Sequence, residues 1–336
     1  MKETAIRMAH GAGGRMMADL IRDLFAATLD NPPLQQMADA TLLRLNEQRL
    51  AISTDSFVVR PLFFPGGDIG SLAVHGTVND IAMSGARPLW LTAGFILEEG
   101  LEMAVLERVV HSMASAATES DVLVVAGDTK VVERGHGDGI YINTAGVGVV
   151  PPGLEIGPAQ GRPGDVVLLN GPVGDHGIAV LSQREGLSFE TELVSDSASL
   201  YRLVQVLLAA APHTHILRDL TRGGLAAALN ELAIASAIGI EIEEGAVPVR
   251  PAVRAACEML GFDPFTVANE GKLVAFVPEE EAAAALAALR THPLGHEAAR
   301  IGIVTADHPG RVLARTAIGG RRIVDMPLGE LLPRIC

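Results

Sequence analysis

The stretch from Asp55 to Pro88, DSFVVRPLFFPGGDIGSLAVHGTVNDIAMSGARP, decides the fold. Just before it, Leu50 to Thr54 is an apolar run of strand length that leads into a carboxylate. Inside it, Gly66-Gly67 interrupts the chain before a segment from about Asp68 to Ser84 whose apolar spacing predicts a helix. Asp80 lies within that predicted helix among apolar neighbours. The stretch therefore predicts a strand, a glycine turn and a helix that carries a candidate functional acid.

Outward from this stretch, apolar segments of strand length alternate with amphipathic segments of helix length. A proline- and glycine-rich run from Pro151 to Gly164 is the best linker candidate, and a second series of strands and helices follows it. A length of 336 residues favours two packed domains or one large domain. The expected segments are a Gly-rich N-terminal segment and helix at 1–40, an N-terminal domain at 41–155, a C-terminal α+β domain at 156–320 and a mobile tail at 321–336.

The charge balance argues against nucleic acid as the main partner. The 26 Lys and Arg and 40 Asp and Glu residues give a formal net charge of −14, whereas a phosphate backbone attracts basic surfaces. The charge balance does not argue against a nucleotide ligand, because backbone N–H groups and a metal between carboxylates and phosphates can hold one. The start of the chain has no signal-peptide pattern, and no apolar run reaches the roughly 20 residues of a membrane span. We therefore expect a cytoplasmic protein.

Aspartates recur where predicted elements begin or end. Carboxylates spread over several loops suit Mg²⁺, which takes few protein oxygens and leaves its other positions to phosphates. Taken singly, each of these aspartates is also typical of a helix or turn cap, and only the position of Asp80 inside a helix is hard to explain in that way. The candidate metal ligands are Asp55, Asp68, Asp80, Asp128 and Asp219.

Two further segments are candidates for phosphate binding. His10-Gly11-Ala12-Gly13-Gly14 precedes a predicted helix at 15–29, so its N–H groups and the helix dipole could hold a phosphate. The alternative is a flexible N-terminus, and no P-loop pattern occurs in the chain. Gly127-Asp128-Thr129-Lys130 places a carboxylate, a hydroxyl and an ammonium in one predicted turn after a buried strand. This fits a metal–phosphate site, and the alternative is an exposed turn.

The chain ends in Pro333-Arg334-Ile335-Cys336. A thiol on a mobile tail can reach a partner's site and then a site on its own chain, whereas the alternative is a chance terminus. The other cysteine, Cys257, fits an ordinary buried helix position. The two cysteines have no metal-binding spacing.

Together with the opening stretch, four segments and the terminus resemble the HypE family of hydrogenase maturation proteins, the carbamoyl dehydratases. The segments are AGDTKVVERGHGDGIYINTAGVG (126–148), GDHGIAVLSQREGLSFE (174–190), RDLTRGGLAAALNELA (218–233) and NEGK (269–272), and the terminus is PRIC. The resemblance covers essentially the whole chain. This family is in turn similar to aminoimidazole ribonucleotide synthetase, selenophosphate synthetase and thiamine monophosphate kinase.

The resemblance implies a two-domain α+β fold like that of aminoimidazole ribonucleotide synthetase. The N-terminal domain would dimerise and bind ATP, and the C-terminal α/β domain would hold a mixed sheet. The implied cofactors are ATP and Mg²⁺, with the metal on the aspartates above. The implied nucleotide contacts are His10, Gly11, Gly13, Gly14, Asn79, Thr129 and Lys130.

The resemblance also implies a reaction. A HypF-like carbamoyltransferase would load a carbamoyl group onto the Cys336 sulfur, and ATP would phosphorylate the carbamoyl oxygen. A base would then remove an N–H proton as phosphate leaves, so that a thiocyanate remains on Cys336. The cyanide would pass to iron on a HypC–HypD scaffold for a nickel–iron hydrogenase. Lys130 and Glu270 are the candidate acid and base, although Glu270 by itself is also typical of a surface carboxylate.

Two other functions remain open at this point. One is an ATP-dependent small-molecule synthetase or kinase of the same superfamily, for which Cys336 would be incidental. The other is a non-catalytic maturation scaffold, which would tolerate Asp80→Asn. The aspartate set and the GDTK segment count against the scaffold, and the PRIC terminus counts against the simple kinase.

Overall fold

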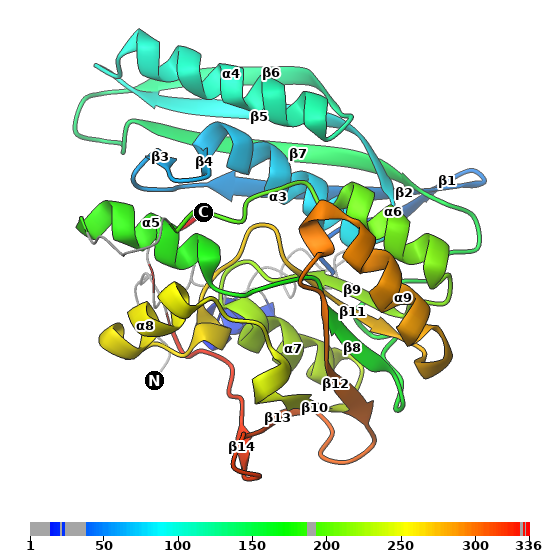
Figure 1. The fold of residues 1–336 in the computed structure, drawn as a ribbon. Coiled ribbons are helices and arrows are strands. Elements are labelled where there is room, and N and C mark those ends of the chain that lie inside the picture. Colours follow the sequence, from blue (N-terminus) through cyan, green and yellow to red (C-terminus); the bar gives the residue numbers. More distant parts are fainter. Residues whose placement is uncertain (1–13, 21, 24–37, 187–192, 330–331, 333) are drawn as a thin grey trace.

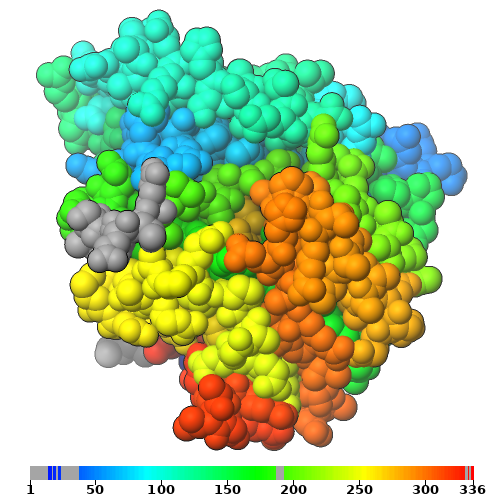
Figure 2. Space-filling model, in the orientation of Figure 1, coloured from blue at the N-terminus to red at the C-terminus, as the bar shows by residue number. Residues whose placement is uncertain are grey.

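The computed structural model describes residues 14–20, 22–23, 38–186, 193–329, 332 and 334–336. Its elements form two sheet-containing layers, one above the other (Figure 1). The space-filling view shows the N-terminal layer, in blue and cyan, resting on the C-terminal layer, in green to red (Figure 2). Three expected nucleotide contacts, His10, Gly11 and Gly13, lie outside the described residues.

The N-terminal layer holds a five-stranded sheet in the order β1-β2-β7-β5-β6. Within it, β5 and β6 pair in parallel and the other neighbours pair antiparallel. Helix α3 packs against β2, β5 and β7, and α4 lies beside α3 (Figure 1). The elements of this layer are β1 (Thr41–Leu45), β2 (Gln48–Phe57), β3 (Phe63–Phe64), β4 (Gly67–Asp68), α3 (Ile69–Met83), β5 (Arg87–Glu98), α4 (Met103–Glu119), β6 (Leu123–Val132) and β7 (Ile140–Val150).

The C-terminal layer holds a seven-stranded mixed sheet in the order β14-β13-β10-β12-β8-β11-β9. Its strands are β8 (Val166–Leu169), β9 (Ile216–Asp219), β10 (Gly239–Glu243), β11 (Leu273–Val277), β12 (Ala299–Thr305), β13 (Arg311–Arg315) and β14 (Arg321–Ile323). Its helices are α5 (Asp175–Glu185), α6 (Tyr201–Ala210), α7 (Gly224–Ala235), α8 (Pro251–Leu260) and α9 (Glu279–Thr291), with 3₁₀ turns η4 (Glu244–Ala246), η5 (Pro264–Thr266) and η6 (Pro293–Gly295). The described part of the N-terminal segment contains α1 (Arg15–Leu20).

Helix α3 connects the two layers. All of its residues except Ser71 and Asp80 are buried, because it packs on the N-terminal sheet and also contacts β9 of the C-terminal sheet. A helix that is apolar on all sides is typical of such a central position. Gly76 permits the close approach of β2, since a Cβ there would lie 2.9 Å from the Phe57 ring. The helix therefore carries Asp80 to the junction of the two domains.

The predicted two-domain α+β fold is confirmed. The predicted helix at 68–84 matches α3, with Asp68 and Ser84 as its caps. The predicted turn at Gly127–Lys130 is wrong, because these residues continue β6 through the ladder with β5. The strand before them is not buried either, since β6 is an exposed edge strand. Among the described residues, no helix has the length and apolar character to span a bilayer.

Candidate functional site

The C-terminus lies between the N-terminal sheet layer and α5 (Figure 1). The backbone N–H of Val58, just after β2, donates to the Cys336 carbonyl at 3.0 Å. The Cys336 side chain lies close to the Arg222 guanidinium and to the Glu270 carboxyl. Burial is the main cause that raises the pKa of this thiol, and the Arg222 guanidinium opposes the rise. The last residue of the chain therefore lies inside a site built by both domains.

Glu270 is buried, with 3% of its surface exposed. Burial raises the pKa of its carboxyl well above the usual range, and the charges of Asp219 and Asp55 raise it further. Its Oε1 has no hydrogen-bond partner in the part of the chain that the structure describes. The surface position that its local sequence allowed is therefore wrong, and the carboxyl group binds protons more tightly than an ordinary glutamate.

Three carboxylates meet at the domain junction. One oxygen from each of Asp39, Asp80 and Asp219 lies within 4.8 Å of the other two. Burial is the largest cause that raises the pKa of all three, to about 6 for Asp39 and about 8 for Asp219. The charges of neighbouring aspartates raise the pKa of Asp80 and Asp219 further, whereas the Arg218 guanidinium opposes the rise at Asp39. Asp219 Oδ2 has no hydrogen-bond partner among the described residues. Negative charges so close together resist joint ionisation, and a cation between them would relieve this repulsion. Carboxylate oxygens are ligands that Mg²⁺ prefers, so these three aspartates form a candidate Mg²⁺ site.

Asp55 lies beside this group, at the carboxyl end of β2. Burial raises its pKa, and its charge is one cause of the raised pKa of Asp80 and of Asp219. Arg222 is the main cation that opposes the shift of Asp55. The charges of Cys336, Asp55 and Glu270 in turn raise the pKa of Arg222. The positive charge of Arg222 therefore acts on both the Cys336 thiol and the Asp55 carboxylate.

Three predicted site residues make contacts within the protein instead. Asp68 Oδ1 caps α3 by accepting from the N–H groups of Gly70 and Ser71, at 2.7 and 3.2 Å. The Asn79 side chain accepts from the Leu200 N–H and donates to the Ala198 carbonyl. Gly14 lies directly against the Pro327 backbone, where a Cβ would meet the carbonyl oxygen at 2.3 Å. Their expected metal and nucleotide roles stay predictions.

Asp128, Thr129 and Lys130 lie on β6, and Lys130 Nζ pairs with Asp128 Oδ2 at 2.6 Å on the surface. Across the sheet, Asp128 pairs with Gly94 on β5, and Gly94 pairs with Asn143 on β7. Asn143 in turn pairs with Ser56 on β2, so three strand spacings separate Asp128 from Ser56. With neighbouring strands about 4.8 Å apart, Asp128 is roughly 14 Å from the β2 position next to Asp55. Within one chain, the structure does not bring this segment to Cys336.

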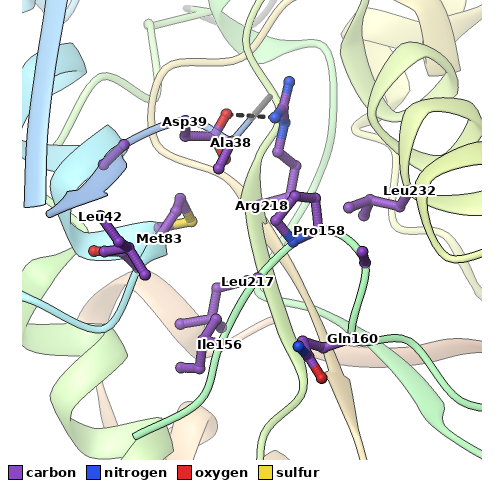
Figure 3. A pocket seen from close by; sticks show the side chains of 14 residues that line it. Ala38, Asp39, Leu42, Met83, Ile156, Pro158, Gln160, Leu217, Arg218 and Leu232 are labelled. Carbon is purple, nitrogen blue, oxygen red and sulfur yellow. Dashed lines mark ion pairs between the residues drawn. The ribbon is translucent and has the colours of Figure 1, made fainter. Parts of the chain in front are cut away.

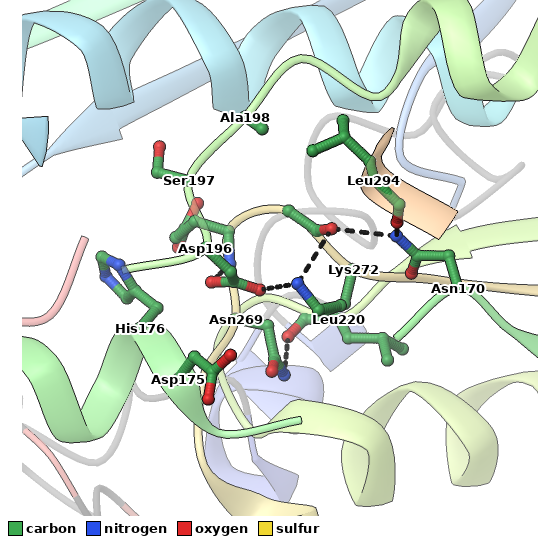
Figure 4. A network of polar contacts seen from close by, with 12 residues as sticks. Asn170, Asp175, His176, Asp196, Ser197, Ala198, Leu220, Asn269, Lys272 and Leu294 are labelled. Atoms are coloured by element: carbon green, nitrogen blue, oxygen red, sulfur yellow. Dashed lines mark hydrogen bonds and ion pairs between the residues drawn. The ribbon is translucent and has the colours of Figure 1, made fainter. Parts of the chain in front are cut away.

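A buried ion pair between Asp196 and Lys272, which sequence reasoning missed, lies next to the Glu270 backbone. Asp196 accepts from the Glu270 backbone N–H at 3.0 Å and from Lys272 Nζ at 2.9 Å. In Figure 4 these groups meet near His176, with Asn269 beside them. The Asn269 side chain accepts from the Gly174 N–H at 2.7 Å and donates to the Leu220 carbonyl. The NEGK motif at 269–272 was the available signal, but nothing in it pointed to Asp196.

A cavity of about 320 Å³ opens next to the carboxylate group. Asp39 belongs to both, and its ion pair with Arg218, at 2.6 Å, forms one wall (Figure 3). Sequence reasoning missed Asp39 because no motif surrounds it. The apolar part of the lining comes from both domains and includes Leu42, Met83, Ile156, Leu217 and Leu232. The cavity therefore has an apolar interior and a charged end at the candidate metal site.

The comparisons with known proteins show the family and the fold of the chain. Residues 37–150 match the family model of the AIR synthase related protein N-terminal domain, and residues 162–314 match that of the C-terminal domain. The chain is 57% identical to carbamoyl dehydratase HypE of Azotobacter vinelandii, over 100% of this chain and 98% of that protein. It is 49% identical to carbamoyl dehydratase HypE of Escherichia coli strain K12, over 98% of this chain and 99% of that one.

Solved structures show the same similarity. A HypE–HypF complex matches with a TM-score of 0.87 and 47% identity, over 92% of this chain and 99% of that chain. HypE in complex with ATP matches with a TM-score of 0.84 and 52% identity, over 99% and 100%. A ThiL protein complexed with AMPPCP and TMP matches with a TM-score of 0.70 at 21% identity, over 93% and 96%, which shows a shared fold alone.

Proposed function

This chain belongs to the carbamoyl dehydratase HypE family, and on that premise we propose that it uses ATP to dehydrate a carbamoyl group on its own Cys336 to a thiocyanate. The observation that carries the proposal is that the Cys336 thiol lies close to the buried Glu270 carboxyl, next to a group of carboxylates. The thiocyanate would supply the cyanide ligand of a nickel–iron hydrogenase.

The proposed reaction has two steps, transfer of a phosphoryl group and loss of phosphate. The carbamoyl oxygen attacks the γ-phosphorus of ATP, the bond to the bridging oxygen breaks, and ADP leaves. The nitrogen loses one proton in this step and the second in the next, when the C–O bond breaks and phosphate leaves. A C≡N group remains on the sulfur. The net change converts S-carbamoyl cysteine and ATP to S-cyanocysteine, ADP, phosphate and one proton.

Glu270 is the proposed base. Because the Glu270 carboxyl lies close to the thiol, a carbamoyl group on the Cys336 sulfur would bring its nitrogen near that carboxyl. A general base works best when its pKa lies near the working pH, and burial moves Glu270 in that direction. Arg222 lies close enough to influence both Cys336 and Glu270, so its charge would favour the ionised carboxylate and the phosphorylated oxygen.

Mg²⁺ is the proposed metal, held by Asp39, Asp80 and Asp219 with Asp55 nearby. The unpartnered Oδ2 of Asp219 and the mutual repulsion of the three carboxylates support this assignment. When bound, Mg²⁺ would neutralise phosphate charge. Asp68 and Asp128 do not belong to this group in the described structure, so their metal roles need separate tests.

A homodimer is the proposed assembly. The edge strand β6 exposes Leu123, Val125 and Val131, with 66%, 57% and 67% of their surfaces accessible. A long exposed apolar edge is typical of a protein interface. Because Lys130 lies on this strand and far from Cys336 of its own chain, we propose that it acts in the site of the second copy.

The other proposed partners are a HypF-like carbamoyltransferase and an iron-carrying HypC–HypD scaffold. The solved HypE–HypF complex of a relative supports the first, and only the family resemblance supports the second. Consumption of ATP makes the cytoplasm the proposed location.

The decisive experiment follows the C-terminal peptide by mass spectrometry. The protein is incubated with carbamoyltransferase, carbamoyl phosphate and ATP. We expect a carbamoyl adduct on Cys336 that loses one water only when ATP and Mg²⁺ are present. An unmodified Cys336 with ATP still hydrolysed would contradict the proposal and favour a small-molecule synthetase.

A further inference from the structure

The last three residues are held by their backbone carbonyls from two sides. On one side, the Val58 N–H donates to the Cys336 carbonyl at 3.0 Å and the Arg60 N–H donates to the Arg334 carbonyl at 3.2 Å. This alternation is the pattern of an added antiparallel strand. On the other side, His176 Nε2 lies 2.7 Å from the Ile335 carbonyl oxygen. The tail therefore lies along the segment that follows β2, with a bend at Arg334 (φ 53°) and with the carbonyl just before Cys336 facing α5.

The chemistry of its partners determines the tautomer of His176. A carbonyl oxygen only accepts, so Nε2 must carry the hydrogen. Burial is the main cause that lowers the pKa of His176, so the ring is neutral and Nδ1 is an acceptor. The Ser195 hydroxyl, 2.7 Å from Nδ1, must then be its donor. The same hydroxyl oxygen accepts from the Ser197 N–H at 3.1 Å, which orients it.

The surroundings of His176 hold the ring rigidly. The ring is fully buried and packs edge-on against Phe64, with centroids 5.4 Å apart and planes at 89°. Ser195 is itself fixed by its backbone N–H, which donates to the Pro65 carbonyl at 2.8 Å. Phe64 and Pro65 belong to the N-terminal layer, whereas His176 begins α5 of the C-terminal layer. The contact with Ile335 therefore depends on both domains.

We propose that His176, oriented by Ser195, is a positioning residue that fixes the Ile335 carbonyl and thereby holds the Cys336 sulfur against Glu270. This inference rests on the proposed function for the reaction that it serves. The binding step itself is independent of that reaction. Ile335 is 3% exposed, and its side chain packs in the apolar core. The side chain and the carbonyl of Ile335 therefore both hold the tail at the residue just before Cys336.

The first test measures alkylation of the two cysteines by iodoacetamide in the full-length protein without ATP. His176→Phe keeps the aromatic packing on Phe64 but removes the donor, whereas His176→Gln keeps an N–H donor near the Nε2 position. Since a lost buried hydrogen bond changes an equilibrium by about tenfold, we expect His176→Phe to speed alkylation of Cys336 about tenfold. We expect His176→Gln to stay near the wild-type rate.

Cys257 is the internal control. It is buried on α8, which packs against α5, so it reports any general loosening around His176. Its alkylation should not change in either variant. An unchanged rate at Cys336 in His176→Phe would overturn the proposal, and so would equal acceleration at both cysteines, because that result means a merely structural role.

The second test measures turnover of the carbamoylated protein. His176→Phe should lower kcat about tenfold while the KM for ATP changes less than about twofold, because the residue positions the sulfur and not the nucleotide. His176→Gln should restore most of kcat. A raised KM with unchanged kcat would contradict the proposal. If no variant or wild-type protein turns over, the alkylation result still decides whether His176 holds the tail.

Discussion

The Glu270 carboxyl group lies close to the Cys336 thiol in a site where burial raises the pKa of both groups. Asp196 and Lys272 support Glu270 from the C-terminal domain, and Val58 holds the Cys336 backbone from the N-terminal domain. The pair therefore exists only when both domains and the tail are in place.

Glu270→Gln should abolish dehydration. Glutamine keeps the shape of the side chain but cannot accept the N–H proton, and removal of a general base costs about 10²- to 10⁴-fold in rate. Mass spectrometry should find that the carbamoyl adduct on Cys336 persists in the presence of ATP. Glu258→Gln, at an exposed position on α8, is the matched control and should leave the rate unchanged. Loss of water at the wild-type rate in Glu270→Gln would assign the base elsewhere.

Asp219→Asn should change stability and activity in opposite directions. Without metal, the substitution removes one of three mutually repelling carboxylates, so the melting temperature should rise by about 2 °C. With Mg²⁺ and ATP, loss of a ligand should lower turnover about 100-fold. Calorimetry in EDTA and a phosphate-release assay measure the two effects. A lower melting temperature together with normal turnover would mean that Asp219 is a structural group.

The metal-free protein should lose stability as the pH rises from about 4 to 8. The folded-state pKa is about 6 for Asp39 and about 8 for Asp219, both above the ordinary value of 3.8. The folded state therefore holds protons that the unfolded chain has already released, and the stabilisation present at low pH disappears through this window. Melting curves in EDTA should show this fall. Mg²⁺ should raise the melting temperature more at pH 8 than at pH 5, and an equal rise at both would contradict the assignment.

Two substitutions of Asp68 distinguish a role as a helix cap from a role as a metal ligand. Asp68→Ala removes the acceptor for the Gly70 and Ser71 N–H groups and should lower the free energy of unfolding by about 1 kcal/mol. Asp68→Asn keeps an oxygen acceptor and should retain both stability and turnover. If Asp68→Asn keeps its stability but loses Mg²⁺-dependent turnover, Asp68 is a metal ligand as the sequence predicts.

Mixing two inactive variants tests whether Lys130 acts across a dimer. Lys130→Ala and Cys336→Ser should each be inactive alone. In a randomly exchanged mixture about half of the dimers are mixed, and each has one intact site, so about a quarter of wild-type activity should return. Sedimentation should show the dimer. No recovery in a mixture that has exchanged subunits would place Lys130 and Cys336 of one chain in the same site, and an active Lys130→Ala variant would place Lys130 outside the chemistry.

Local patterns were enough for most of the fold. Strand β2 and helix α3 lie where the apolar spacing and the glycines predict them, because the period of a pattern reports the local backbone form directly. β6 was the exception. The glycine in Gly127-Asp128 resembles a turn signal, but pairing with β5 carries the strand through it, since tertiary hydrogen bonds override a local preference.

The sequence alone determined the chemical inventory of this protein: a terminal thiol at Cys336, a candidate base at Glu270 and acids at Asp55, Asp80 and Asp219. Only the tertiary structure decided which of these groups meet. Packing of α3 between two sheets brings Asp80 to Asp219 and adds Asp39, which no motif marked. Docking of the tail on His176 brings the half-buried Cys336 close to Glu270. Sequence spacing reports neighbours along a helix or strand, whereas a site between domains depends on contacts among distant segments, which only the packed core positions.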